Sequence, residues 1–420
     1  MGTVPDEQKA IPSWLDRAFI VSALKCGDPT VDESSVQLKS MGQVGGGLLS
    51  ETYRVVAQLH SLGESHERET SVIVKSSPTV GGFIKELADS GVFTKETVAY
   101  GSFLPAMDAA LETIEGESWR PLAPKFYHHG SQPTSFLVVE DLDASGFHKV
   151  AQGVSLDVDQ CRAVLRNLAR MHAASVTLLD DQQYNEKLFH QSLIFSRRLV
   201  DTFQDKNQRY ADGTFDFLEH YTWFQKYVHK MEKLSTRFVG EVVDVVEQCQ
   251  VDFKVMVHGD LHKNNVMFRE DSDGLQVRFY DFQGIHIGSP AEDLQYFFHT
   301  SASLEVMRDH TQGLLADYHA VLQGTLRALG LQRQADGYPL EQLLRDMDHF
   351  GMIAVFVSFT MLPFMLNFGE MEFAIDTSDD QFEVKSKKFY EKSWRNDRYL
   401  AYLQHLLPVF DSKGLLDQKV

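Results

Sequence analysis

Short runs of β-forming residues recur through the first third of the chain. They cover positions 36–41, 52–59 and 71–75, and turn-forming residues separate them. Runs of this length with Val, Ile and Tyr favour strands. Gly45, Gly46 and Gly47 fall between the first two runs, where glycine favours a turn. The pattern predicts three antiparallel strands with a glycine-rich first turn.

Helical spacing follows this region. Apolar positions in residues 92–104 predict a helix, and the apolar run 135–139 predicts another short strand. From about residue 150 the pattern is mainly helical. In residues 160–175 an i, i+3, i+4, i+7 spacing joins Cys161, Val164, Leu165, Leu168 and Met171.

Three further runs, at 254–257, 266–268 and 276–280, predict strands inside the helical part. The fold class is therefore α+β, with a small antiparallel β-rich lobe that carries one helix and a larger, mostly helical lobe. We expect a helical extension over residues 1–34, the small lobe over 35–142 and the large lobe over 143–420.

One apolar run, residues 351–368, is nearly long enough to span a bilayer. Polar residues interrupt it, and Pro363 lacks the N–H that a continuous helix requires. We therefore predict a buried helix broken near Pro363 and no membrane span.

Composition limits the classes of partner and compartment. Hydrophobic residues make up 43% of the chain and charged residues 24%, as in ordinary globular proteins. The net charge of -19 disfavours nucleic acid as a partner. Cys26, Cys161 and Cys249 are scattered without metal-ligand spacing, and the start of the chain lacks the apolar core of a secretory signal. We expect a reduced, cytoplasmic setting and no obligate protein partner.

The segment that carries candidate chemistry is HGDLHKNN, from His258 to Asn265. It lies between two apolar runs, and a second strand-end aspartate follows at Asp281. Phosphoryl transfer requires a carboxylate that accepts the proton of the attacking hydroxyl, and Asp260 fits this role. Mg²⁺ prefers oxygen ligands, which Asn265 and Asp281 offer. His258 is more plausible as a brace of the loop than as a catalyst.

The runs VHGDLHKNNVMF and YDFQGIHIGSPAEDLQYFF resemble the ecdysteroid kinase-like family, part of the choline-kinase-like and aminoglycoside-phosphotransferase group. DFQ, in place of the DFG of protein kinases, is the most specific signature, and the resemblance covers roughly residues 35–410. It implies a two-lobed protein-kinase-like fold. It also implies transfer of the γ-phosphate of ATP to hydroxyls of small molecules, with ecdysteroids as the best-known substrates and detoxification proposed for many members.

The resemblance also implies roles for individual residues. Asp260 matches the catalytic base, and Asn265 and Asp281 match the metal ligands. Lys75, at the end of SVIVK, matches the lysine that binds the α- and β-phosphates, and Glu96 matches its ion-pair partner.

Three other parts match less specific features. Residues 138–142, which include Val138, Val139 and Glu140, match the hinge that contacts adenine. Gly45, Gly46 and Gly47 match the glycine turn near phosphate, although they lack the GxGxxG order. Asp293 resembles a helix aspartate that holds amides of the catalytic loop.

Alternatives stay open for several of these residues. Glu86 competes with Glu96 as the partner of Lys75, Asp293 could simply cap a helix after Pro290, and the glycines could form a plain flexible turn. His262 stands where many relatives carry an aromatic residue, so the wall of the acceptor pocket could differ.

Four functions compete. A kinase for an apolar hydroxylated molecule is preferred to a choline or ethanolamine kinase, whose cationic substrate needs converging aromatic faces or carboxylates. A protein kinase lacks support because no A-P-E motif follows Asp281 at a useful distance. A pseudokinase usually lacks the lysine, base or metal ligands, which are all present. Aromatic candidates for an apolar pocket, which could equally be core, are Trp223, Phe224, Phe350, Phe356, Phe359, Phe364 and Phe368.

Overall fold

The computed structural model describes residues 11–47, 50–63, 66–77, 91–179, 187–197, 212–247, 251–367, 388 and 391–417. Glu86, Cys249 and Phe368, considered above, lie outside these residues. The chain divides into two compact units. The first comprises Met1–Pro105 and Pro121–His148, and the second comprises Ala106–Arg120 and Lys149–Val420.

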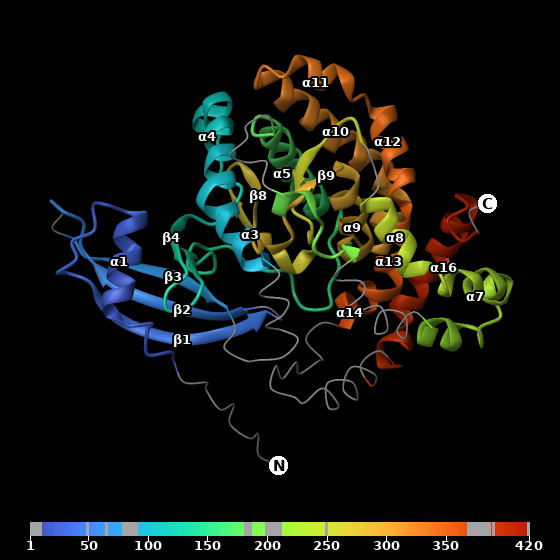
Figure 1. Cartoon of the computed structure of the whole chain (residues 1–420), viewed down its shortest axis with the longest axis horizontal. Coiled ribbons are helices and arrows are strands. Elements are labelled where there is room, and N and C mark those ends of the chain that lie inside the picture. The colour runs from blue at the N-terminus through green and yellow to red at the C-terminus, as the bar shows by residue number, and fades with distance from the viewer. Residues whose placement is uncertain are drawn as a thin grey trace, which may run out of the picture. The chain divides into compact units, whose positions relative to one another are not determined.

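The first unit contains a five-stranded antiparallel sheet in the order β1-β2-β3-β5-β4 (Figure 1). The three strands predicted in the first third of the chain and the one predicted at 135–139 are present. The FYHHG strand was missed because its sequence has no apolar alternation. The strands are β1 Gln37–Gly47, β2 Ser50–Leu59, β3 Arg68–Ser76, β4 Phe126–Gly130 and β5 Phe136–Glu140.

Helix α1, Arg17–Gly27, begins after Asp16, whose side chain accepts the N–H of Phe19. It packs against β4, and Ile20 and Leu24 join the sheet residues Val55 and Val74 in one buried core.

The glycine cluster does not form the expected turn. Gly46 pairs with Glu51 and Gly47 with Ser50, so β1 continues to Gly47. The register shifts between Gln43 and Gly46. Glycine inside a strand often marks such an irregularity, because it has no side chain to hold the register.

The helix predicted at 92–104 is longer and changes its winding. It consists of α3 Phe93–Val98, the π-helical turn η2 Ala99–Phe103 and α4 Leu104–Glu115. The N–H of Leu104 donates to Ala99 O, five residues back. The wide turn comes just before Pro105, which has no N–H to donate.

The second unit is mainly helical with two short sheets. Strand β6 Val255–Val257 pairs with β9 His286–Gly288, and β7 Val266–Asp271 pairs with β8 Gly274–Phe279. The other elements are η3 Gly116–Ser118, α5 Val158–Val176, η5 Lys187–His190, η6 Gln225–Tyr227, α7 Val228–Ser235, α8 Phe238–Glu247, η7 Lys263–Asn265, η8 Phe282–Gly284, α9 Pro290–Ser301, η9 Val306–His310, α10 Thr311–Ala328, α11 Gln332–Gly337, α12 Leu340–His349, α13 Gly351–Thr360, α14 Leu362–Asn367 and α16 Asp397–Ser412.

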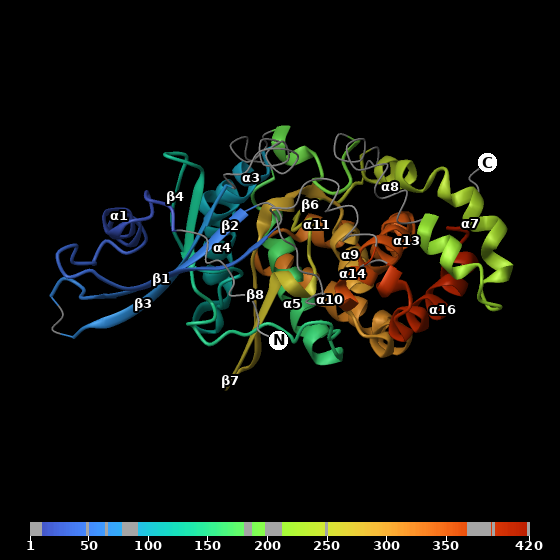
Figure 2. The same cartoon turned by 90° about the horizontal axis from the view of Figure 1, so that it is seen from below.

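The apolar run at 351–367 forms two helices, with the break at Met361, two residues before Pro363. Every residue of α13 is buried, and α13, α14 and α16 lie side by side (Figure 2). Within the described residues, no helix combines the length and apolar character needed to cross a bilayer.

Candidate active site

The loop between β6 and β7 holds the predicted base beside a predicted metal ligand. Asn265 Nδ2 donates to Asp260 O at 2.9 Å and to Asp260 Oδ2 at 3.2 Å. The amide nitrogen is therefore engaged within the loop. Among the described residues no hydrogen bond occupies Asn265 Oδ1, which leaves this oxygen available for a cation.

His258 joins this loop to the end of β8. Its Nδ1 accepts the N–H of Asp260 at 3.4 Å, and its Nε2 faces Tyr280 O at 3.1 Å. Because a carbonyl can only accept, the ring proton lies on Nε2. Burial is the main cause of a lowered pKa of His258, which favours this neutral form. Through these two contacts, His258 links the loop after β6 to the end of β8.

Two glycines allow these loops to come together. Gly259 has φ 77°, and a Cβ placed on it would lie 2.1 Å from Gly284 O. A Cβ on Gly284 would lie 2.8 Å from the carbonyl carbon of Gly259. Neither position has room for a side chain, so the segments HGD and DFQG require glycine here.

Asp281 follows β8 in a left-handed conformation with φ 65° and ψ 62°. It is the sole residue other than glycine with positive φ in the part of the chain that the structure describes. Such a conformation costs of order 1–3 kcal/mol and persists where the surroundings enforce it, often at functional sites.

Side chains of helix α9 accept hydrogen bonds from the backbone of residues 258–263, which we call the catalytic loop after its proposed role. Asp293 Oδ2 accepts the N–H of His258 at 2.7 Å, and its Oδ1 accepts the N–H of Gly259 at 2.9 Å. Ser301 Oγ accepts the N–H of Lys263 at 2.8 Å. The helix is capped instead by Ser289 and its partner Glu292. The side chain of Asp293 thus faces the loop and is not the helix cap.

A buried network supports Asp293 in turn. His172 Nε2 lies 3.1 Å from Asp293 Oδ2, and its Nδ1 lies 2.7 Å from Tyr318 OH. Burial alone would raise the pKa of Asp293. The hydrogen bond from His172 and the loop amide of Gly259 outweigh burial and lower it. The carboxylate is therefore charged where it binds the loop.

Tyr296 was not among the residues selected from the sequence, yet it contacts the predicted base. Its hydroxyl donates to Asp260 Oδ1 at 2.8 Å. His262 Nδ1 accepts the N–H of Asn264 at 3.2 Å, which leaves the ring proton on Nε2, 3.6 Å from the same oxygen. Burial is the main cause of a pKa of His262 lowered to about 4, so this ring is neutral at physiological pH.

The Asp260 carboxyl is more basic than an ordinary aspartate. The Asp260 side chain is 29% exposed, and its partial burial, followed by the charge of Asp281, raises the pKa of Asp260 to about 7, against the lowering effect of the Tyr296 hydrogen bond. A carboxylate with a pKa near neutral accepts a proton more readily than one near 4. The environment therefore suits a general base.

In the first unit, the predicted lysine and glutamate form an ion pair. Lys75 Nζ lies 2.9 Å from Glu96 Oε1 and 2.8 Å from Glu96 Oε2. The Glu96 side chain is 2% exposed and that of Lys75 is 12% exposed. Strand β3 and helix α3 supply the two residues, and the pair fixes the ammonium where a phosphate could still reach it.

The predicted adenine segment lies in β5, which has a partner strand on each side. Val138 pairs with Val74 and with His128, and the N–H of Glu140 donates to Lys125 O at 2.8 Å. The Glu140 carboxylate accepts the N–H of Lys125 at 3.0 Å. Val138 and Val139 are buried and Glu140 is partly exposed, so this segment has no free strand edge and little exposed side-chain surface.

The donor set fits a magnesium ion. Asn265 offers an amide oxygen and Asp281 a carboxylate, while none of the described residues belong to a cluster of three or more His, Cys, Asp or Glu that could enclose a metal. Mg²⁺ is usually held by one or two protein oxygens with phosphates and water, so a dense cage is not needed.

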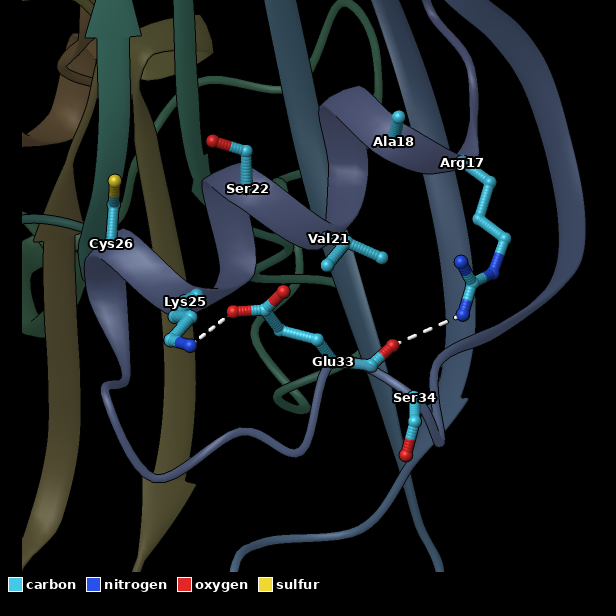
Figure 3. A pocket seen from close by; sticks show the side chains of 8 residues that line it. All are labelled: Arg17, Ala18, Val21, Ser22, Lys25, Cys26, Glu33 and Ser34. Atoms are coloured by element: carbon cyan, nitrogen blue, oxygen red, sulfur yellow. Dashed lines mark hydrogen bonds and ion pairs between the residues drawn. The ribbon is translucent and has the colours of Figure 1, made fainter.

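A pocket of about 670 Å³ lies on α1 and is lined by residues of α1 together with Glu33 and Ser34 (Figure 3). Lys25 pairs there with Glu33, and Arg17 Nη2 donates to Glu33 O at 3.0 Å. Lys25 is thus engaged by a carboxylate and Arg17 by a backbone carbonyl, and none of the candidate catalytic residues line the pocket.

Residues 44–331 match the sequence profile of the ecdysteroid kinase-like family. The chain belongs to the ecdysteroid kinase-like family. Membership places it among small-molecule kinases, that is, phosphotransferases with the two-lobed kinase-like fold. A search of curated proteins gave no match.

Three solved structures show distant likeness. The microcompartment-associated aminopropanol kinase is 15% identical, with TM-score 0.41 and coverage of 95% of this chain and 99% of that one. A proposed aminoglycoside phosphotransferase from Ralstonia eutropha JMP134 is 13% identical, with TM-score 0.40 and coverage of 82% and 98%. A glucosamine kinase is 13% identical, with TM-score 0.34 and coverage of 84% and 97%. Similarity at this level does not identify the acceptor of this chain.

Proposed function

We propose that this protein transfers the γ-phosphate of ATP to a hydroxyl of a small molecule, with Mg²⁺ as cofactor. The observation that carries the proposal is the Asp260 carboxylate, which Asn265 and Tyr296 hold in place. Its raised pKa of about 7 suits proton abstraction.

The residues of the second unit divide the chemistry among them. Asp260 orients the acceptor hydroxyl and takes its proton as the new oxygen–phosphorus bond forms and the bond to ADP breaks. Asn265 Oδ1 and the Asp281 carboxylate would hold the metal. When bound, Mg²⁺ neutralises phosphate charge. His258 and Asp293 keep the loop in the geometry that this requires.

The first unit supplies nucleotide contacts. Lys75, fixed by Glu96, binds the α- and β-phosphates, as the family resemblance implies. Gly45, Gly46 and Gly47 at the end of β1 would lie near phosphate, as the family resemblance implies. The segment Val138–Glu140 would lie against adenine, as the family resemblance implies; Val138 and Val139 are 0% and 8% exposed, and Glu140 is partly exposed.

For the acceptor we favour a neutral, largely apolar alcohol such as an ecdysteroid. Phe195 packs edge-on against Tyr296, with ring centroids 6.4 Å apart, and against Phe356 at 5.7 Å. The residue that contacts the base therefore belongs to a buried aromatic cluster, in which Phe195, Tyr296 and Phe356 are 3%, 2% and 4% exposed, and apolar surroundings of this kind suit an apolar ligand. Of the other aromatic candidates, Phe224, Phe350 and Phe359 are buried, whereas Trp223 and Phe364 are partly exposed.

The test is ATP consumption by the purified protein with an ecdysteroid, choline, ethanolamine or a glycoside as acceptor, with Asp260→Asn as the matched variant. We expect turnover with the apolar alcohol, little dependence on salt, and a loss of about a hundred- to ten-thousand-fold in Asp260→Asn. Salt-sensitive turnover of choline alone would favour a choline-type kinase. Wild-type rates in Asp260→Asn would contradict the role of the base.

A further inference from the structure

Tyr296 is one helical turn from Asp293 on α9, and both side chains face the catalytic loop. Asp293 holds the loop backbone at His258 and Gly259, whereas Tyr296 reaches the carboxylate of Asp260 itself. The i, i+3 spacing places the two contacts on one face of the helix. The helix thus holds both the backbone and the reactive side chain of the same loop.

Packing of the Tyr296 ring does not require its hydroxyl. The residue is 2% exposed and its ring contacts Phe195, so phenylalanine would fill the same space. A buried hydroxyl is costly unless it is hydrogen-bonded, and here its partner is an ionisable carboxylate at 2.8 Å. The hydroxyl therefore acts on Asp260 and not on the core.

We propose that Tyr296 is a positioning residue, which fixes the Asp260 carboxylate for attack on the acceptor hydroxyl. This inference rests on the proposed kinase function. Tyr296 occupies Oδ1, where the His262 ring also lies at 3.6 Å, and Asn265 Nδ2 approaches Oδ2 at 3.2 Å. A carboxylate anchored at both oxygens cannot rotate about its terminal bond. Its remaining lone pairs consequently keep one direction for the acceptor hydroxyl.

The test is a double-mutant cycle in Tyr296 and Asp260, measured as phosphate transfer to the acceptor that the wild type prefers. Tyr296→Phe should lower kcat about ten-fold and leave KM for ATP within about two-fold, because a hydrogen bond to a charged group is lost away from the nucleotide. In the Asp260→Asn background the same change should cost less than about two-fold, because the base through which it acts is absent.

Tyr338→Phe provides the matched control. The Tyr338 hydroxyl donates to Asp346 Oδ2 at 2.7 Å, and the residue is 1% exposed, so the same bond is removed at equal burial outside the catalytic loop. We expect kcat of Tyr338→Phe to stay within about two-fold of wild type in either Asp260 background. Thermal unfolding of each variant shows whether the fold is retained.

A second measurement does not depend on turnover. With tyrosine ¹³C-labelled at Cζ, the resonance missing from Tyr296→Phe is that of Tyr296. It should shift in Asp260→Asn, because the hydroxyl then faces an amide in place of a carboxylate, while the Tyr338 resonance stays unchanged.

Non-additive losses together with a shifted Tyr296 resonance would support the proposal. The proposal would be overturned if Tyr296→Phe lowered kcat by the same factor in both Asp260 backgrounds. It would also be overturned if the Tyr296 resonance had the same chemical shift in Asp260→Asn as in the wild type. If the wild type phosphorylated none of the acceptors, the proposed function would fail, and the resonance would still decide whether Tyr296 holds the carboxylate.

Discussion

Gly259 and Gly284 lie backbone against backbone, so that a Cβ on Gly259 would approach Gly284 O to 2.1 Å. The first glycine precedes the proposed base, and the second follows Asp281 and Phe282. Their contact therefore sets how close the loop of the proposed base comes to the segment that carries Asp281, the second proposed metal ligand. The backbone atoms of Gly284 cannot move away from such a Cβ as the end of a flexible side chain could.

Gly259→Ala should destabilise the protein and abolish activity. Alanine at φ 77° costs about 1–2 kcal/mol, and the clash adds to this cost. We expect the thermal midpoint to fall by roughly 5 °C or more.

The control is Gly324→Ala on the exposed side of α10, where a Cβ meets nothing within 4 Å. It should raise the midpoint by a few degrees, since alanine favours a helix by about 1 kcal/mol. Equal effects at the two positions would contradict this account.

A magnesium titration of activity should distinguish variants of the proposed metal ligands from a variant of the proposed phosphate-binding lysine. Asn265→Ala and Asp281→Ala each remove an oxygen ligand, so both should raise the Mg²⁺ concentration needed for half-maximal activity. Lys75→Met should instead raise KM for ATP, with little change in the magnesium requirement. If the three variants gave the same magnesium curve, the division of roles between the two units would be wrong.

The Lys75–Glu96 ion pair should matter for activity far more than a surface pair does. Glu96→Gln keeps the shape of the side chain but removes the charge that fixes Lys75, and we expect activity to fall at least about ten-fold. Glu33→Gln is the matched control, because its partner Lys25 belongs to the same unit and the pair is half exposed. It should leave activity unchanged.

The candidate catalytic residues could be selected from the sequence because the proposed chemistry dictates their types and spacing. Asp260, Asn265 and Asp281 stand in a fixed pattern between apolar runs, and Lys75 ends a strand. Tyr296 could not be found in this way, because a tyrosine in an apolar helix reads as core. The contacts of Asp293, Tyr296 and Ser301 with the loop show which face of α9 lies against the candidate site.

Other features depend on contacts between distant parts of the chain. No local sequence pattern predicts the pairing of β6 with β9, and none predicts the half-buried FYHHG strand. The glycines at 45–47 signalled a turn, but pairing with β2 drew them into the strand. Buried aromatic residues such as Phe359 and candidate pocket residues such as Phe364 have the same helical spacing, so the sequence alone could not separate core from acceptor site.

The raised pKa of Asp260 predicts a stability penalty in the metal-free protein. An unfolded aspartate has a pKa of about 3.9, whereas that of folded Asp260 is about 7. Between these values the unfolded state releases the proton more readily than the folded state. The contribution of Asp260 to stability is therefore lost progressively as pH rises from about 4 to about 7, and stays lost above that.

Asp260→Asn removes this titration, so its thermal midpoint in EDTA should exceed that of the wild type, by more at pH 8 than at pH 5.

Asp293→Asn is the opposing control. The pKa of Asp293 is lowered in the fold, so its stabilising effect is complete throughout this window and is lost only in stronger acid. That variant should be less stable than wild type by a similar amount at both pH values. Adding Mg²⁺ should narrow the Asp260→Asn difference at pH 8, because a cation near Asn265 and Asp281 favours the charged carboxylate. A midpoint difference for Asp260→Asn that did not grow from pH 5 to pH 8 would contradict the raised pKa assigned to this half-buried carboxyl.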